Sequence, residues 1–267
     1  MEWLQYIDTS RVLLFTLVLT RMSGIVVIAP VFGGSDVPMV VRALFSFSLS
    51  ILMMPLLWHY EVIEPATLID YVLVIGSELT IGLSVGLCVM IFFTGLYLTG
   101  SLIGQMGGLM AAQLFDPSSG EQIPILSRFI YLLGITVFAC IGGLRVMIAA
   151  LLDTFETLPP GGGGFHTPLV ETILTVLSSG FVLAFRISAP VTIGILTALI
   201  VMGLLSKTLP QLNLMSVGFG INNILMLVIL MISIGAGVMC FQQSISVVLE
   251  EIYYGLHTNI NPDLFSM

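Results

Sequence analysis

Two long stretches of this chain carry no formally charged side chain, and they constrain the fold more than any other feature. They cover residues 79–115 and 208–249. An α-helix built from the second stretch would be about 60 Å long, roughly twice the ~30 Å hydrocarbon core of a bilayer. Stretches of this length predict membrane helices that bend, break or pack inside other protein, rather than simple spans facing lipid.

The overall composition points to the same environment. Charged residues make up 8% of the chain and the mean hydropathy is +1.13, whereas soluble domains are about 25% charged. A water-soluble fold of 267 residues could not keep its surface hydrated with so few charges. The net charge of −8 and the lack of a Lys/Arg cluster argue against nucleic acid as a partner. The sequence therefore predicts an all-α, multi-pass integral membrane protein.

Six apolar regions divide the chain, and we expect about six long, kinked or broken helices. Their approximate limits are 12–33, 43–58, 69–115, 129–152, 170–206 and 214–249. The connections between them are rich in Gly, Pro, Asn, Asp and Ser, which favour turns. None of these connections is long enough to separate two soluble domains, so we expect one membrane unit.

Three ionisable residues, Arg21, Glu78 and Arg186, lie well inside apolar regions. An isolated charge at the bilayer centre costs about 2.5–3.5 kcal/mol on insertion scales, so each is expected to face protein or a wet cavity. Two interpretations remain open. The charges form interhelical salt bridges or polar subunit contacts, or they line a transport or proton path.

Glycines recur at helical spacing in the third apolar region. Gly82 and Gly86 form one pair, and Gly100, Gly104 and Gly108 form a longer series. Small residues at this spacing let helix backbones approach closely inside a membrane, so we interpret them as helix-packing glycines. A second, compatible interpretation is that they make this helix easy to kink or unwind near a gate.

Enzyme motifs give no usable signal. Residues 82–86 formally match the GxSxG pattern, but that motif needs a strand-to-helix turn and a histidine partner. Here it lies in a helical apolar run, and the histidines at 59, 166 and 257 fall in predicted loops or near the C-terminus. We predict no catalytic residue, no cofactor and no metal ligand.

An ordered set of short motifs along nearly the whole chain resembles the flagellar export-gate FliR family, with the virulence-secretion SctT proteins as relatives. The motifs lie at residues 19–24, 29–32, 37–42, 105–107, 115–117, 126–128, 153–159, 203–207, 210–213 and 217–219. Two departures stand out. Where the family often has an Asn-Gly-His type turn, this chain has Gly142-Gly143-Leu144. Where the family often has a Pro-Leu-Lys-like stretch, this chain has Gly220-Ile221-Asn222.

The resemblance implies a non-enzymatic subunit of the flagellar type III protein export gate in the bacterial inner membrane, within the flagellar basal body. It implies a P-type part over residues 1–170 and a Q-type helix pair over 171–267. The expected partners are FliP- and FliQ-type subunits, which with this chain enclose a pore for exported unfolded polypeptides. An FlhB-type subunit is expected near the cytoplasmic entrance of the pore, with an FlhA-type subunit nearby. The alternatives are a virulence-type gate subunit or a small-molecule or ion carrier, although a carrier would be expected to show inverted repeats. An intramembrane hydrolase would need a paired nucleophile and base, which we do not find.

Two segments are expected to carry the function. Glycines weaken the helix before residue 108, and Pro117 disfavours helix at the residue before it. We therefore expect residues 106–122 to form an apolar plug in the pore, as the resemblance also implies; the alternative is a well-packed helix end. The plug candidates are Met106, Met110, Leu114, Phe115, Asp116 and Pro117.

The second segment is the connection before the last helix. It is expected to face the cytoplasm and contact an FlhB-type subunit through Lys207, Pro210, Gln211 and Asn213. In such an assembly, Arg21 and Arg186 become candidates for contacts between subunits.

Overall fold

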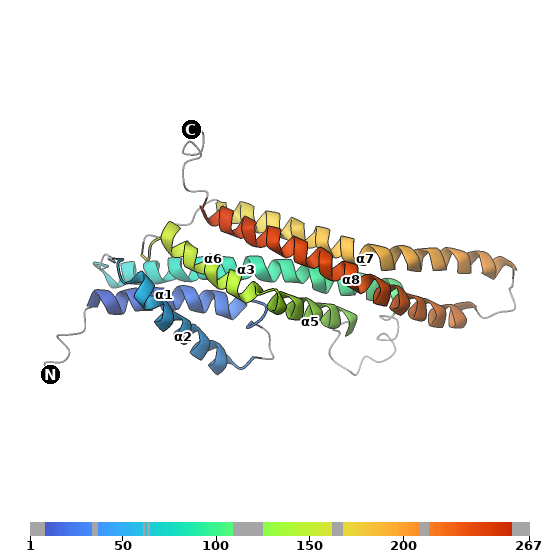
Figure 1. Ribbon diagram of the computed structural model, residues 1–267, viewed down its shortest axis with the longest axis horizontal. Coiled ribbons are helices and arrows are strands. Elements are labelled where there is room, and N and C mark those ends of the chain that lie inside the picture. Colours follow the sequence, from blue (N-terminus) through green and yellow to red (C-terminus); the bar gives the residue numbers. More distant parts are fainter. Residues whose placement is uncertain are drawn as a thin grey trace, which may run out of the picture. The chain divides into compact units, whose positions relative to one another are not determined.

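The computed structural model describes residues 9–33, 37–60, 62, 65–108, 125–161, 168–208 and 214–257. Within these residues every regular element is an α-helix (Figure 1). The helices are α1 (Thr9–Ile28), α2 (Met39–Leu57), α3 (Leu68–Gly107), α5 (Ile125–Cys140), α6 (Gly143–Thr157), α7 (Pro168–Thr208) and α8 (Leu214–His257). Five of them are long and apolar enough to cross a membrane, and the bent α5–α6 pair would make a sixth crossing. The predicted all-α membrane architecture is confirmed.

Local chemistry fixes both ends of the 40-residue helix α3. At its start, the Asp70 amide donates to the Thr67 hydroxyl (3.2 Å), and the Thr67 amide donates to the Asp70 carboxylate (3.1 Å). This reciprocal arrangement is a capping box, which satisfies amides that have no partner inside the helix. At its end, Gly108 adopts φ 81° and its amide donates to the Gln105 carbonyl. A left-handed glycine is a common way to stop a helix.

The fourth apolar region forms two helices rather than one. α5 and α6 meet at an angle of 70°, and Gly142 at the junction has φ 77°. A residue with a Cβ rarely adopts this backbone conformation, so glycine makes the sharp break possible here. The break coincides with the departure at residues 142–144 from the motif of the resembling family.

The chain folds into two compact units, each assembled from separate stretches. Unit 1 contains Met1–Ile91, Gly143–Leu177 and Val248–Met267, and unit 2 contains Phe92–Gly142 and Ser178–Val247. Both units therefore take residues from each side of position 170, where the boundary between the P-like and Q-like parts was expected. That boundary stays a prediction.

In unit 1, α1 and the first half of α3 run parallel and in close contact. A Cβ added to Gly82 would overlap the Arg21 carbonyl, and one added to Gly86 would lie 3.2 Å from the Ile25 carbonyl. From the other side, a Cβ on Gly24 would lie 2.9 Å from the Leu83 amide nitrogen. These glycines let the two backbones touch. α2 packs on α1 through Phe15 and Phe47, with edge-to-face rings 5.7 Å apart.

In unit 2, the second half of α3 contacts each of the other helices. It crosses α7 where Gly95 meets Gly180, and a Cβ on Gly95 would overlap the Gly180 carbonyl. It runs antiparallel to α5, where Gly100 faces the backbone of Ser127. Aromatic rings complete this core in one cluster, formed by Phe92, Phe93, Tyr131, Phe138 and Phe241. Aromatic pairs of this geometry each contribute about 0.5–1.5 kcal/mol beyond their buried area.

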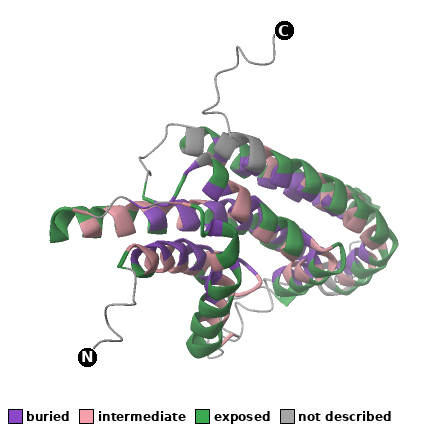
Figure 2. Ribbon diagram, turned by 60° about the vertical axis from the view of Figure 1, so that its left-hand side comes forward, coloured by how far each residue is buried: buried purple, intermediate pink, exposed green. Residues whose placement is uncertain are grey.

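Burial differs sharply among the helices (Figure 2). About half of the apolar windows of α1 and α3 are buried, whereas α7 and α8 bury only 17% of theirs. The exposed residues of α7 and α8 are predominantly large and apolar. Such surfaces need lipid or another protein to cover them.

Candidate functional site

An ion pair between α1 and α3 lies at the centre of unit 1. Arg21 Nε donates to Glu78 Oε2 at 2.6 Å, and both side chains are completely buried. The close approach of the helices at Gly82, one turn from Glu78 on α3, brings the two charges together. A buried ion pair needs further hydrogen bonds to offset the loss of hydration of both groups.

The remaining nitrogens of Arg21 bind the end of α6. One terminal nitrogen donates to the carbonyl and to the hydroxyl of Thr154, both at 3.1 Å. The other donates to the Leu158 carbonyl at 3.0 Å. The Phe155 ring lies against the guanidinium, whose central carbon is 4.1 Å from the ring centroid. Because the last carbonyls of a helix lack intrahelical donors, Arg21 acts as a cap for α6.

The second oxygen of Glu78 is also occupied. Oε1 accepts a hydrogen bond from the Gly161 amide at 2.9 Å. Gly161 has φ 85°, so the turn that presents this amide favours glycine. We call the group formed by Arg21, Glu78, Thr154, Leu158 and Gly161 the ionic cluster. It ties α1, α3 and the turn after α6 together by charge-assisted hydrogen bonds.

The ionic cluster has the properties of a structural connection. Both charges are fully buried and hydrogen-bonded to fixed partners within the chain. A proton path requires groups that exchange protons with water, and these two have no exposed surface. Of the two interpretations left open by the sequence, the geometry favours the interhelical salt bridge for Arg21 and Glu78. This salt bridge joins two helices of the same chain, α1 and α3.

The end of α3 in unit 2 leads into the segment expected to form a plug. Asn222 on α8 donates from its side-chain amide to the Met106 carbonyl at 3.1 Å. Next to it, a Cβ on Gly107 would overlap the sulfur of Met226. The side-chain oxygens of Asn222 and Asn223 are buried and have no hydrogen-bond partner among the described residues. The Asn222 side chain therefore binds one carbonyl in the last turn of α3, and two side-chain oxygens of α8 beside it have no donor among the described residues.

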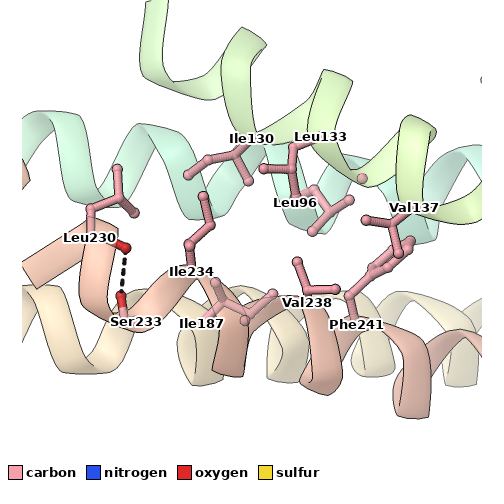
Figure 3. Close-up of a pocket in the computed structure, with 12 residues that line it drawn as sticks. Leu96, Ile130, Leu133, Val137, Ile187, Leu230, Ser233, Ile234, Val238 and Phe241 are labelled. Carbon is pink, nitrogen blue, oxygen red and sulfur yellow. Dashed lines mark hydrogen bonds between the residues drawn. The ribbon is translucent and has the colours of Figure 1, made fainter.

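Unit 2 also contains an apolar pocket among four helices (Figure 3). Its walls are side chains of α3, α5, α7 and α8, with Leu96, Ile187 and Phe241 among them. The hydroxyl of Ser233 lines it as well, but donates to the Leu230 carbonyl at 3.3 Å. Ligand sites for polar molecules place a few convergent polar groups among apolar walls. This pocket suits an aliphatic group.

Comparison with known proteins identifies the family. Residues 12–248 match the model of bacterial export proteins, family 1. The chain belongs to this family. The flagellar biosynthetic protein FliR of Aquifex aeolicus is 27% identical over 228 residues, which cover 85% of this chain and 88% of that protein. FliR of Bacillus subtilis is 28% identical over 213 residues, covering 76% and 79%.

The virulence branch is also represented among the relatives. The surface presentation of antigens protein SpaR of Shigella sonnei is 28% identical over 157 residues, which cover 58% of this chain and 60% of that protein. The resemblance to the FliR family seen in the sequence is confirmed, and the protein is a membrane component of bacterial flagellar or type III protein export.

The glycines predicted for helix packing in this export protein divide into two groups. Gly82, Gly86 and Gly100 lie where helices touch. A Cβ added to Gly104 would have no described atom within 4 Å outside its own stretch of helix, and Gly108 ends α3 with a positive φ. The i, i+4, i+8 series is therefore not one packing face. Gly104 is buried but leaves free space for a Cβ, and at Gly108 the backbone conformation favours glycine.

The other predicted site residues fall in three places. Met106 is half-exposed at the end of α3, Arg186 is exposed on α7, and Lys207 is exposed in the last turn of α7. The rest lie outside the described residues: Met110, Leu114, Phe115, Asp116, Pro117, Pro210, Gln211 and Asn213. Sequence reasoning missed Thr154, Gly161 and Asn222. Only Asn222 gave a signal, as half of a polar pair in an apolar stretch.

Proposed function

We propose that this protein is a core subunit of the flagellar type III export gate, which forms a protein-conducting pore in the inner membrane with FliP- and FliQ-type subunits. The family match over residues 12–248, with FliR proteins of distant bacteria as relatives, carries this proposal. FliR of Aquifex aeolicus covers 85% of the chain and SpaR 58%, which favours the flagellar branch over the virulence branch.

The distribution of exposed apolar surface supports a place inside an assembly. α7 has 41 residues and α8 has 44, so each is roughly 60 Å long, about twice the hydrocarbon core of a bilayer. Their exposed apolar residues continue along most of this length. Lipid tails cannot cover all of such a helix at once, so other gate subunits must cover the remainder.

Purification of the tagged chain from its own host in mild detergent, followed by mass spectrometry, tests the proposal. We expect P-type and Q-type export subunits at stoichiometric levels, together with FlhB- and FlhA-type subunits at lower levels. An unrelated membrane protein carrying the same tag serves as the control. Recovery of the chain without any export subunit would contradict the proposal.

The plug at residues 106–122 is part of the proposed mechanism. Its support in the described chain is the end of α3, where Gly108 turns the backbone out of the helix and Met106 is half-exposed. Deleting residues 110–119 and measuring ion leak through the assembled complex tests it. We expect a leaky complex of normal composition; unchanged conductance would refute the plug.

The connection after Lys207 is proposed to face the cytoplasm and contact the FlhB-type subunit. Lys207 is exposed at the end of α7, which leaves its charge available to a partner. A cysteine at position 211 should crosslink to that subunit and react with reagents added from the cytoplasmic side. Labelling from the periplasmic side alone would overturn this orientation.

A further inference from the structure

Arg186 is an exposed cation near the middle of α7, and no acid in the described chain pairs with it. The described residues of unit 2 carry Arg128, Arg186 and Lys207 but no aspartate or glutamate. No hydrogen bond or salt bridge joins Arg186 to another described residue. By contrast Arg21, the other arginine deep in an apolar region, is fully paired. The described part of unit 2 therefore has a positive charge that lacks a counter-ion.

The backbone hydrogen bonding of α7 is also interrupted next to Arg186. Pro190 lies inside α7, four residues after Arg186. Proline has no N–H, so it cannot donate the intrahelical hydrogen bond that the carbonyl of residue 186 would otherwise accept. Away from water, an unsatisfied carbonyl costs several kcal/mol, and such carbonyls are satisfied by neighbouring side chains. One turn of α7 thus presents a cationic donor and a backbone acceptor together.

Apolar surface continues on both sides of this turn. Phe181, Val182 and Phe185 are exposed before it, and Ile193, Leu196 and Ile200 are exposed after it. The bilayer core spans only about 20 residues of helix, roughly half of α7. If lipid covers one half, protein must cover the other. If the core is centred on Arg186, the charge lies in hydrocarbon at a cost of about 2.5–3.5 kcal/mol without a partner.

We propose that the Val182–Ile193 stretch of α7 is a docking surface for an apolar membrane helix of another export-gate subunit, whose Asp or Glu side chain pairs with Arg186. This inference rests on the proposed function. The carboxylate accepts from the guanidinium, and a hydroxyl or amide on the same helix donates to the free carbonyl of residue 186. Val182 and Ile193, one and two turns from Arg186, supply apolar contacts on either side of the charge pair.

The test uses the tagged full-length chain expressed with the other gate subunits. The Arg186→Met variant is compared with Arg186→Lys, which keeps the charge, and with Thr197→Met on the same helix. The hydroxyl of Thr197 is exposed and bonds only its own helix, to the Ile193 carbonyl at 2.8 Å, so its loss should change nothing. Truncating one member of a desolvated charge pair at an interface weakens association roughly 30-fold or more. We expect Arg186→Met to lose the complex, Arg186→Lys to retain part of it, and Thr197→Met to match the wild type.

A photoreactive amino acid at position 182 identifies what covers the surface. We expect a crosslink to a gate-subunit helix that carries an acid, and we expect Arg186→Asp to be rescued when that acid is changed to Arg. Crosslinks only to lipid or to a second copy of this chain, a captured helix without an acid, or an Arg186→Met complex as stable as wild type would each overturn the inference. Failure of the proposed function has a different signature, because the wild-type chain itself would then recover no gate subunit.

Discussion

The ionic cluster predicts that the effect of neutralising Glu78 changes sign when Arg21 is removed. Arg21→Met keeps most of the side-chain volume but removes the guanidinium that donates to Glu78 Oε2, Thr154 and the Leu158 carbonyl. The carboxylate then stays buried with one donor, the Gly161 amide. Breaking a buried pair in this way costs about 3–5 kcal/mol.

Glu78→Gln in the native background should also destabilise, because it leaves the Arg21 charge without its counter-ion. In the Arg21→Met background the same change removes the unpaired buried charge, and the glutamine oxygen can still accept from Gly161. It should therefore recover about 2 kcal/mol of the loss. The double variant remains less stable than the native protein, because the Leu158 carbonyl has lost its donor.

Unfolding of the purified chain in mixed micelles, followed by far-UV circular dichroism, gives the four free energies of this cycle. Arg11→Met is the matched control, because Arg11 is a partly exposed arginine of the same helix that donates to the Trp58 carbonyl. We expect it to cost no more than about 1 kcal/mol. Equal effects of Glu78→Gln in both backgrounds would refute the coupling of the two charges.

Five further substitutions test the helix contacts and the end of α3. Gly82→Ala should destabilise by about 1–3 kcal/mol, because its Cβ overlaps the Arg21 carbonyl; Gly76→Ala on the same helix meets open space and should stabilise by up to about 1 kcal/mol. If Gly82→Ala and Gly76→Ala shifted the midpoint of thermal unfolding equally, the close contact of α1 and α3 would be contradicted. Gly108→Ala should destabilise the protein by about 1 kcal/mol or more, and Gly108→Asn by less, because φ is positive there. Identical midpoints of thermal unfolding for the two variants would count against Gly108 as the cap of α3. Asn222→Ala should speed amide exchange at the end of α3, since the Met106 carbonyl loses its donor. Unchanged exchange would show that this hydrogen bond does not stabilise the helix end.

The helices were largely predictable because hydropathy and turn residues act locally. The six apolar regions correspond to α1, α2, α3, the α5–α6 pair, α7 and α8. The break at Gly142 was not predicted, because glycines also occur inside continuous helices such as α3, as Gly95 shows. A positive φ depends on how the flanking helices pack, which sequence alone does not reveal.

Contacts between distant segments were the part that sequence could not supply. The sequence marked Arg21 and Glu78 as charges needing partners, but nothing in their spacing pairs residues 57 positions apart. Nor does the sequence show that the Leu158 carbonyl, 137 positions away, accepts a hydrogen bond from the same guanidinium. The contact of Gly95 with Gly180 was equally hidden, because each glycine is one of several in its own apolar region and only the crossing of α3 and α7 joins them.

Secretion by the living cell tests the central claim most directly. Deleting this chain in its own host and measuring export of flagellar rod, hook and filament proteins into the medium asks whether it is a core export-gate subunit. Re-expression of the chain in trans and loss of a known export-gate subunit are the controls. The account predicts that export of all three classes stops while their synthesis continues, and that re-expression restores it. Normal export and flagellar assembly in the deletion strain would contradict it.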